Sequence, residues 1–278
     1  MAEFELVTLK SGIKSLRALK NLETFHPVTG PRMEAGILHV RQPRLFERAA
    51  ASAPPFVIWD VGFGAAANVL TAIEALREST AEIEIHSFDH TIAPIKFALK
   101  HSSELGYLVP HESDLRSLLH LRDITLRPGL RWRLHLSDFG ELLASATPLP
   151  SPHAIFYDPY SPSGNPEMWS LDHFRLLRSR LSDDVPCLMT NYTCSTAVRV
   201  TLLLAGFHVG RGCGVGEKRE TTIVSNRLEL LERPLRSDWF KTVRISHAAA
   251  PLGASPAGPA PISPEDFERL SRLEQFRQ

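Results

Sequence analysis

The sequence predicts an α/β protein whose mostly parallel sheet is covered by helices on both faces. From about residue 56 onward, short apolar runs alternate with stretches of helical periodicity, as they do where helices connect parallel strands. A glycine-rich turn also follows the first of these runs and opens a helix, in the segment FVIWDVGFGAAANVL. Such a turn typically binds a nucleotide-like ligand at a helix N-terminus.

The predicted elements follow in chain order. FELVTL and IKSLRAL flank the turn pair Ser11-Gly12 and predict a hairpin. Strands are expected at residues 56–61, 83–88, 130–136, 154–157, 185–191 and 220–224, and helices at 66–76, 92–99, 170–181 and 195–205. A Pro/Ala/Gly linker at 250–264 precedes a short helix at 265–275. We therefore expect three parts: an N-terminal hairpin and substrate-side extension (1–50), a catalytic domain (51–226), and a linker with a C-terminal helix (227–278).

Composition excludes several classes of protein. The chain has 278 residues, 43% of them apolar, with 31 Lys+Arg and 31 Asp+Glu. Disorder, collagen-like repeats and coiled coil are excluded as descriptions of the whole chain. A net charge of zero means that any nucleic-acid binding must depend on a local basic patch.

The sequence predicts neither a membrane span nor a signal peptide, and it predicts no special role for the cysteines. The apolar stretches at 65–76 and 200–206 are too short or too polar to cross a bilayer. The first residues, MAEFELVTLK, lack the apolar core of a signal peptide, so we expect a cytoplasmic protein. Cys187, Cys194 and Cys213 have neither CxxC spacing nor a nearby histidine in zinc-finger register, so buried or idle thiols are expected, with no disulfide and no metal site.

The glycine turn leaves two ligand classes open. Gly62, Gly64 and Ala67 fit G-x-G-x-x-A, which is also the dinucleotide fingerprint, and Asp89 ends the next strand where an acid would bind ribose hydroxyls. Asp60, two residues before the first glycine, favours a cationic ligand such as S-adenosylmethionine, since a pyrophosphate would be repelled. NAD or FAD remains the alternative ligand. The other alternative is that the glycines only form a tight turn between strand and helix and bind no ligand.

The fourth predicted core strand ends in IFYDPYSPSGNPEMW. Its Asp-Pro-Tyr resembles the Asp/Asn-Pro-Pro-Tyr loop of amino-group methyltransferases. Methyl transfer to an amine needs an acceptor that orients the N–H bonds and a stiff loop that holds it. Asp158 is the expected acceptor, Pro159, Pro162 and Pro166 restrict the loop, and Tyr160 is expected to wall the pocket. A proline-rich turn capped by Asp158 is the alternative.

The longer string DPYSPSGNPEMWSLDHF resembles the Asp-Gly-Phe-x-Pro-x-x-Asn-Pro-x-Met-Trp segment of the MnmC-like methyltransferases. The resemblance extends over residues 4–225 and includes FHPVTGPRMEA, DVGFGAAANVL, IHSFDH, RLHLSDF, LLLAGF and VGEKRE. It implies a class I methyltransferase fold with a seven-stranded sheet. It also implies S-adenosylmethionine as cofactor and, as acceptor, the aminomethyl group of wobble 2-thiouridine in tRNA.

The resemblance also implies roles for individual residues. Asp158 is expected to orient the amine. The cofactor side is expected to comprise Asp60, Gly62, Gly64, Asn68, Asp89, Asp138 (toward the adenine amino group) and Phe139 (beside the ring). The substrate side is expected to comprise Pro159, Tyr160, Asn165, Met168 and Trp169. For Asp138 the alternative is a helix cap, and for Met168 and Trp169 it is the core.

The chain departs from the family pattern at several points. The Gly-Phe-Gly-Thr-Gly turn is here Gly-Phe-Gly-Ala-Ala, and the glycine of Asp-Gly-Phe is Pro159. The flavin-dependent domain of bifunctional members has no room in 278 residues, which predicts a stand-alone methyltransferase. If tRNA is the substrate, its basic patch is expected among Lys14, Arg17, Lys20, Lys218 and Arg219.

Two other function classes stay open at this point. G-x-G-x-x-A and Asp89 are compatible with an NAD(P)-binding oxidoreductase, although no Tyr-Lys or Cys-His pair has suggestive spacing. The altered glycine turn is compatible with a non-catalytic S-adenosylmethionine-binding protein.

Overall fold

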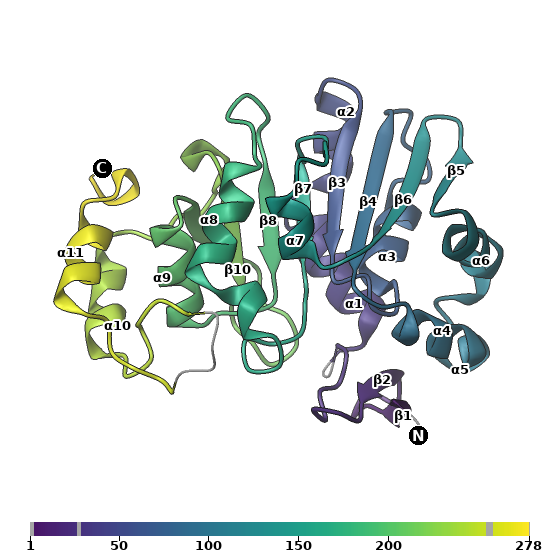
Figure 1. The fold of residues 1–278 in the computed structure, drawn as a ribbon, viewed down its shortest axis with the longest axis horizontal. Helices are drawn as coiled ribbons and strands as arrows, with labels where there is room; N and C mark the ends of the chain where they lie inside the picture. Colours follow the sequence, from purple (N-terminus) through teal and green to yellow (C-terminus); the bar gives the residue numbers. More distant parts are fainter. Residues whose placement is uncertain (1–2, 27–28, 254–257, 278) are drawn as a thin grey trace.

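The computed structural model describes residues 3–26, 29–253 and 258–277, and an eight-stranded sheet forms the centre of that part of the chain (Figure 1). The strand order is β5-β6-β4-β3-β7-β8-β10-β9. β6, β4, β3, β7 and β8 are parallel, whereas β5, β10 and β9 join antiparallel. The strands are β3 (Phe56–Val61), β4 (Ile83–Asp89), β5 (Asp123–Arg127), β6 (Leu130–Leu136), β7 (Ala154–Tyr157), β8 (Leu188–Asn191), β9 (His208–Arg211) and β10 (Thr222–Ser225).

The central strand β3 is apolar on both sides because both faces of the sheet are covered. Phe56 and Ile58 belong to one core cluster. Val57, Trp59 and Val61 belong to another. This alternation, with every residue of β3 buried, is what a strand between two helical layers requires.

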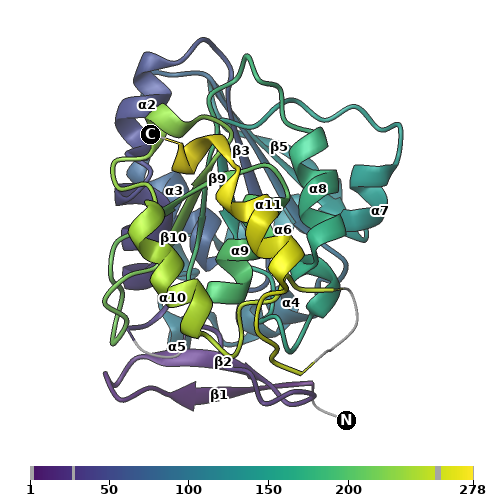
Figure 2. The same ribbon diagram turned by 90° about the vertical axis from the view of Figure 1, so that its left-hand side faces the viewer.

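The helices divide between the two faces. Helices α2 to α6 contribute to the first cluster and α7 to α11 to the second, and Figure 2 shows α3 and α8 on opposite sides of the sheet. The α-helices are α1 (Pro31–Ala35), α2 (Leu45–Ala51), α3 (Ala67–Ala75), α4 (Ala93–Lys100), α5 (Ser102–Leu105), α6 (Glu112–Leu121), α7 (Phe139–Ala144), α8 (Leu171–Ser179), α9 (Thr196–Leu204), α10 (Phe240–Ile245) and α11 (Pro264–Ser271). Shorter turns are the π-helix η1 (Gly36–Arg41) and the 3-10 helices η2 (Val109–His111), η3 (Pro166–Trp169), η4 (Leu228–Leu230), η5 (Ser237–Trp239) and η6 (Glu274–Phe276).

The predicted N-terminal hairpin is present as β1 (Phe4–Thr8) and β2 (Lys14–Ala18), in antiparallel register. It lies apart from the main sheet, beyond the carboxyl ends of the parallel strands (Figures 1 and 2). For the remainder of the first part no helix was predicted, but it contains α1, η1 and α2. These elements are too short for periodicity to reveal, since helical periodicity needs a window of about 11 residues.

The C-terminal part, expected to be a linker with a short helix, packs on the core. Leu270 of α11 is fully buried in the second cluster. The Gln275 side chain accepts from Val209 N (2.9 Å) and donates to Leu235 O (2.9 Å). Leu252 O accepts from Leu171 N at 2.9 Å. Part of the predicted linker, 254–257, lies outside the described residues.

The fold class is confirmed, but the expected count of seven strands is wrong by one. Our prediction missed β5 and β9 because both lie at sheet edges and lack an apolar run: β5 is only partly buried, and β9 is short and contains Gly210. The expected strand at 185–191 starts later, at Leu188. Among the described residues, no helix has the length and apolar character needed to span a membrane.

Candidate active site

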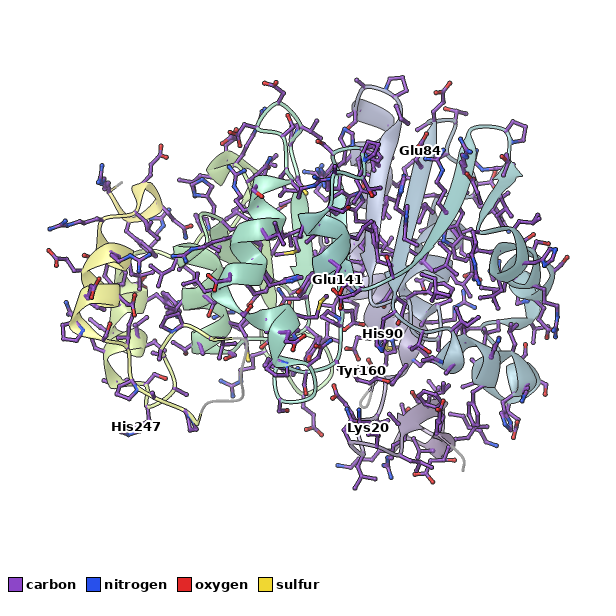
Figure 3. The ribbon with its side chains drawn as sticks, viewed as in Figure 1. Lys20, Glu84, His90, Glu141, Tyr160 and His247 are labelled. Atoms are coloured by element: carbon purple, nitrogen blue, oxygen red, sulfur yellow. The ribbon has the colours of Figure 1, made fainter. Side chains whose placement is uncertain are left out.

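A cavity of about 720 Å³ lies at the carboxyl ends of the parallel strands, and we call it the main cavity. Loops that follow β3, β4, β6, β7 and β8 line it, together with residues between the hairpin and α1. Figure 3 places His90 and Tyr160 between this edge of the sheet and Lys20 of the hairpin region, whereas Glu84 lies at the opposite edge. Open parallel sheets bind their ligands at this edge.

The glycine turn after β3 lines the main cavity, and glycine is required at its two positions for different reasons. Gly62 has φ of +91°, and a Cβ there would lie 2.5 Å from the carbonyl oxygen of Asp158. Gly62 is therefore needed for the contact between two loops, not only for ligand approach. Gly64 has φ of +49°, and its Cβ would press on the Phe25 ring at 3.2 Å.

Asp89 ends β4 and is tied to the glycine turn. Its Oδ2 accepts a hydrogen bond from Gly64 N at 2.9 Å, and its Oδ1 accepts from Thr91 N at 3.1 Å. Burial raises the pKa of this carboxyl, while the bond from Gly64 opposes the rise. Asp89 thus lines the main cavity on the side expected for the cofactor.

Asp158 follows β7 and lies between that strand and α3. Its backbone N–H donates to Val61 O at 3.0 Å, and its Oδ2 accepts from Asn68 Nδ2 at 2.7 Å. Burial raises the pKa of Asp158 to about 7, although the bond from Asn68 lowers it. The Asn68 carbonyl oxygen is buried without a partner among the described residues. Asn68, expected on the cofactor side, is therefore also the direct support of Asp158.

The proline-rich loop is fixed from two directions. Ser161 N donates to Glu23 Oε1 at 2.7 Å, which ties the loop to the segment after the hairpin. Tyr160 lines the main cavity, and its ring packs edge-on against Phe25 with centroids 5.6 Å apart. Pro159, Asn165 and Met168 line the cavity as well.

Trp169 does not line the main cavity, so its expected place on the substrate side is wrong. The side chain is fully buried, and its Nε1 donates to Tyr160 O at 2.7 Å. Tyr157 supports the same loop through a bond from its hydroxyl to Met168 O. Trp169 therefore holds the loop from behind, because an indole N–H in the core needs an acceptor.

Asp60 also lies outside the main cavity, although we expected its carboxylate to face a cationic ligand. The side chain is buried and accepts from Ser87 Oγ at 2.8 Å. Burial raises the pKa of Asp60 to about 7. Asp60 lies on the same buried face of β3 as Phe56 and Ile58, and the spacing of residues along the sequence does not reveal that its carboxylate stays outside the main cavity.

Asp138 and Phe139 line the cavity beyond β6. Asp138 also caps α7, since its Oδ1 accepts from Glu141 N at 2.8 Å. Its position is therefore compatible with a place on the cofactor side and with a role as helix cap. His173 of α8 lines the same region, and its Nε2 is buried without a partner among the described residues. Burial lowers the pKa of His173 to about 4, so this imidazole is neutral at pH 7.

Several lining residues were not predicted individually: Glu23, His26, Glu34, His173 and Tyr192. Glu34 Oε1 lies 3.9 Å from His26 Nδ1. Burial raises the pKa of Glu34 and lowers that of His26. The available signal was the matching segment FHPVTGPRMEA, which contains both residues.

The main cavity is strongly acidic. Seven carboxylates and one lysine line it within the part of the chain that the structure describes: Glu23, Glu34, Asp89, Asp138, Asp158, Glu167 and Glu217, with Lys218. The Lys218 ammonium lies 4.7 Å from the centre of the Tyr192 ring and donates to Tyr192 O at 3.0 Å. No group of three or more His, Cys, Asp or Glu among the described residues is arranged to hold a metal ion. A cationic ligand suits this environment and a pyrophosphate does not.

Comparison with known proteins decides the class of enzyme. A family model described as S-adenosyl-L-methionine-dependent methyltransferase matches residues 111–227. Two relatives are tRNA 5-methylaminomethyl-2-thiouridine biosynthesis bifunctional proteins MnmC. The protein of Marinomonas sp. is 34% identical over 60% of this chain and 26% of its own length. The protein of Ectopseudomonas mendocina is 31% identical over 73% of this chain and 32% of its own length. The crystal structure of MnmC2 from Aquifex aeolicus superposes with a TM-score of 0.71 and 25% identity, covering 90% of this chain and 78% of that one.

The chain contains an MnmC-like methyltransferase domain. It spans only about a quarter to a third of the length of these curated relatives. The enzyme class is S-adenosylmethionine-dependent methyltransferase, and S-adenosylmethionine is the cofactor. The oxidoreductase and non-catalytic alternatives are therefore set aside.

The residues of this MnmC-like domain fit the cofactor. Acidic side chains line the cavity, which suits a sulfonium and an ammonium group, and about 720 Å³ exceeds the lower end of the usual range for small-molecule sites. Gly62, Gly64 and Asp89 would hold it beside the glycine turn. Buried polar atoms of Asn68 and His173 that lack partners within the described chain supply further hydrogen-bonding groups.

Proposed function

We propose that this methyltransferase acts on a primary amine, the 5-aminomethyl group of wobble 2-thiouridine in tRNA. The observation that carries the proposal is the Asp158 carboxylate, held by Asn68 at 2.7 Å within an acid-lined cavity. An amine in that cavity would meet a carboxylate able to accept its N–H bonds. The names of the MnmC relatives supply the identity of the acceptor.

S-adenosylmethionine supplies an electrophilic methyl group, and the new N–C bond forms as the S–C bond breaks. Asp158 orients the amine and stabilises positive charge that develops on its nitrogen. The amine is mostly protonated at neutral pH and must lose a proton before attack. We infer that this proton passes to solvent before attack, because Asp158 must stay ionised to stabilise the positive charge that develops on the nitrogen.

The surrounding residues keep this arrangement rigid. Asn68 orients Asp158 from α3, and Glu23 joins the loop to the N-terminal extension by accepting from Ser161 N. Pro159 and Tyr160 form the adjoining wall on the proposed substrate side. A tRNA acceptor would place the enzyme in the cytoplasm.

The test is methyl transfer to tRNA that carries 5-aminomethyl-2-thiouridine, followed by mass spectrometry of its nucleosides. We expect a mass increase of one methyl group on that nucleoside and on no other. The same tRNA with 2-thiouridine at the wobble position is the matched control, because it lacks only the aminomethyl group. Absence of product with a preparation that binds S-adenosylmethionine would overturn the acceptor while leaving the enzyme class intact.

A further inference from the structure

A second pocket of about 310 Å³ lies beside the main cavity, and we call it the arginine pocket. Its lining residues are Cys194, Thr196, Arg199, Arg211, Arg219, Glu220, Trp239 and Thr242. Three guanidinium groups therefore face one carboxylate. The pocket has the opposite charge to the main cavity, where seven carboxylates face one lysine among the described residues.

Two loops separate the arginine pocket from the main cavity. In the loop after β8, Tyr192 lines the main cavity and Cys194 lines the arginine pocket. In the loop between β9 and β10, Lys218 lines the main cavity and its neighbour Arg219 lines the arginine pocket. A ligand that extends from the main cavity over these loops therefore meets the arginine pocket, because residues one or two positions apart in the chain line the two pockets.

The arginine pocket is a built feature. Arg199 is almost fully buried, and it donates to Thr222 Oγ1 (3.0 Å), Thr221 O (2.8 Å) and Glu220 Oε1 (2.7 Å). These bonds fix the wall and use the Glu220 carboxylate. Arg211 is 43% exposed at its side chain and lies 3.9 Å from Glu220, and Arg219 is exposed. The last two arginines are therefore the ones that can bind a ligand from solvent.

We infer that the arginine pocket binds a backbone phosphate of the RNA that delivers its base to the main cavity. This inference rests on the proposed function, which supplies the RNA. The acidic main cavity attracts an aminomethyl group but repels the phosphates attached to it, so binding requires positive charge beside the cavity. Arginine is well suited to this role because its planar group binds phosphate oxygens in pairs.

The experiment compares two double variants in the full chain. Arg211→Ala/Arg219→Ala removes the two accessible guanidinium groups. Arg77→Ala/Arg116→Ala is the matched control, since Arg116 lies on α6 at the opposite edge of the sheet (Figure 1). Affinity for an anticodon stem-loop RNA with 5-aminomethyl-2-thiouridine is measured over a range of potassium chloride concentrations. Methylation of that RNA and of the free 5-aminomethyl-2-thiouridine nucleoside is measured in parallel.

We expect the pocket variant to bind the RNA about tenfold or more weakly at low salt, with the slope of log K against log salt reduced by about 1. Its KM for the RNA should rise, while S-adenosylmethionine affinity and nucleoside methylation stay at the parent level. Arg211→Lys/Arg219→Lys should recover part of the affinity, since it keeps the charge but loses the paired geometry.

An RNA affinity and salt slope of the pocket variant equal to those of the parent would overturn the inference. Equal losses in the control variant would also overturn it, because the effect would then be one of total charge. A parent that binds S-adenosylmethionine but methylates neither RNA nor nucleoside overturns the proposed function and this inference together. A parent active on both, with an unchanged pocket variant, overturns this inference alone.

Discussion

Asn68 on α3 donates a 2.7 Å hydrogen bond to the carboxylate of Asp158, which follows β7. The bond joins the two segments that the sequence singles out for different reasons, the glycine turn with its helix and the Asp-Pro-Tyr loop. Gly62 lies between them, where a Cβ would collide with the Asp158 carbonyl at 2.5 Å. The cofactor-side turn and the residue proposed to orient the amine are thus parts of one packed unit.

Replacing Asp158 by Asn should reduce methyl transfer by about 10²-fold or more with nearly unchanged S-adenosylmethionine affinity. Asn keeps the shape and an oxygen that can accept from Asn68, but it loses the charge that stabilises the amine in the transition state. Single-turnover transfer and calorimetry of cofactor binding measure the two effects separately. Asp184→Asn, at an exposed carboxylate, is the control. Parent-level transfer by Asp158→Ala would reduce this residue to a turn former.

The rate of methyl transfer should rise with pH around a midpoint near 7. Burial raises the pKa of Asp158 to about 7, and the reaction needs the carboxylate form, so lowering the pH below that value removes activity. Asn68→Leu should move the midpoint to higher pH, because the lost bond stabilises the ionised carboxyl. The profile of kcat against pH tests both statements. A midpoint identical in parent and variant would show that another group controls the profile.

The sequence predicted the central sheet, and most of the site residues it singled out line the main cavity, because those parts depend on local pattern. Phe56 to Val61 is an apolar run bounded by turn residues, and the string around Asp158 is specific. Asp60 and Trp169 were misplaced for a different reason. Which face of a strand or loop a side chain occupies depends on tertiary packing: Ser87 from β4 holds Asp60, and the carbonyl of Tyr160 holds Trp169.

Of the arginine pocket, the sequence singled out only Arg219, as a member of the expected basic patch, and it did not predict the pocket itself. Its residues come from the loop after β8, α9, β9, the loop before β10, η5 and α10, and adjacent positions such as Lys218 and Arg219 line different pockets. The basic patch expected around Lys14 and Arg17 is partly neutralised instead. Lys14 pairs with Glu104 at 3.3 Å and Arg17 with Glu5 at 3.5 Å. Charge counts along a chain do not reveal such pairing.

Replacing Asp89 by Ala should weaken S-adenosylmethionine binding by about 10- to 100-fold. Asp89 organises the glycine turn through Gly64 N, and it is the expected acceptor for the ribose hydroxyls, each charge-assisted bond contributing about 1.5–3 kcal/mol. Calorimetry measures the affinity, with Asp184→Ala as a control that removes an exposed carboxylate. An affinity equal to that of the parent would exclude Asp89 as a cofactor ligand.

Ala66→Gly should leave the free energy of unfolding nearly unchanged, whereas Ala67→Gly should lower it by about 1–2 kcal/mol. Ala66 has φ of +63°, a left-handed conformation that costs an L residue about 1–2 kcal/mol and glycine almost nothing. This relief offsets the loss of a buried methyl group. Ala67 begins α3 and is equally buried, so glycine there brings only losses. Denaturant unfolding of the two variants provides the comparison, and equal destabilisation would contradict the role assigned to the φ angle.

Leu270→Ala should destabilise the protein by about 2–5 kcal/mol, the usual cost of removing a buried leucine side chain. Leu270 is fully buried in the core cluster that also contains Trp59 and Phe174, and α11 packs on α9. Removal of residues 250–278 should therefore reduce the yield of folded protein, because it also removes the Gln275 bonds to Val209 N and Leu235 O. Thermal unfolding of the full chain measures the effect of the point variant. Leu121→Ala, at a leucine that is 61% exposed, is the matched control and should change stability by less than about 0.5 kcal/mol. If Leu270→Ala were as stable as Leu121→Ala, α11 would not contribute to the core, and the truncated chain should then bind S-adenosylmethionine as tightly as the parent.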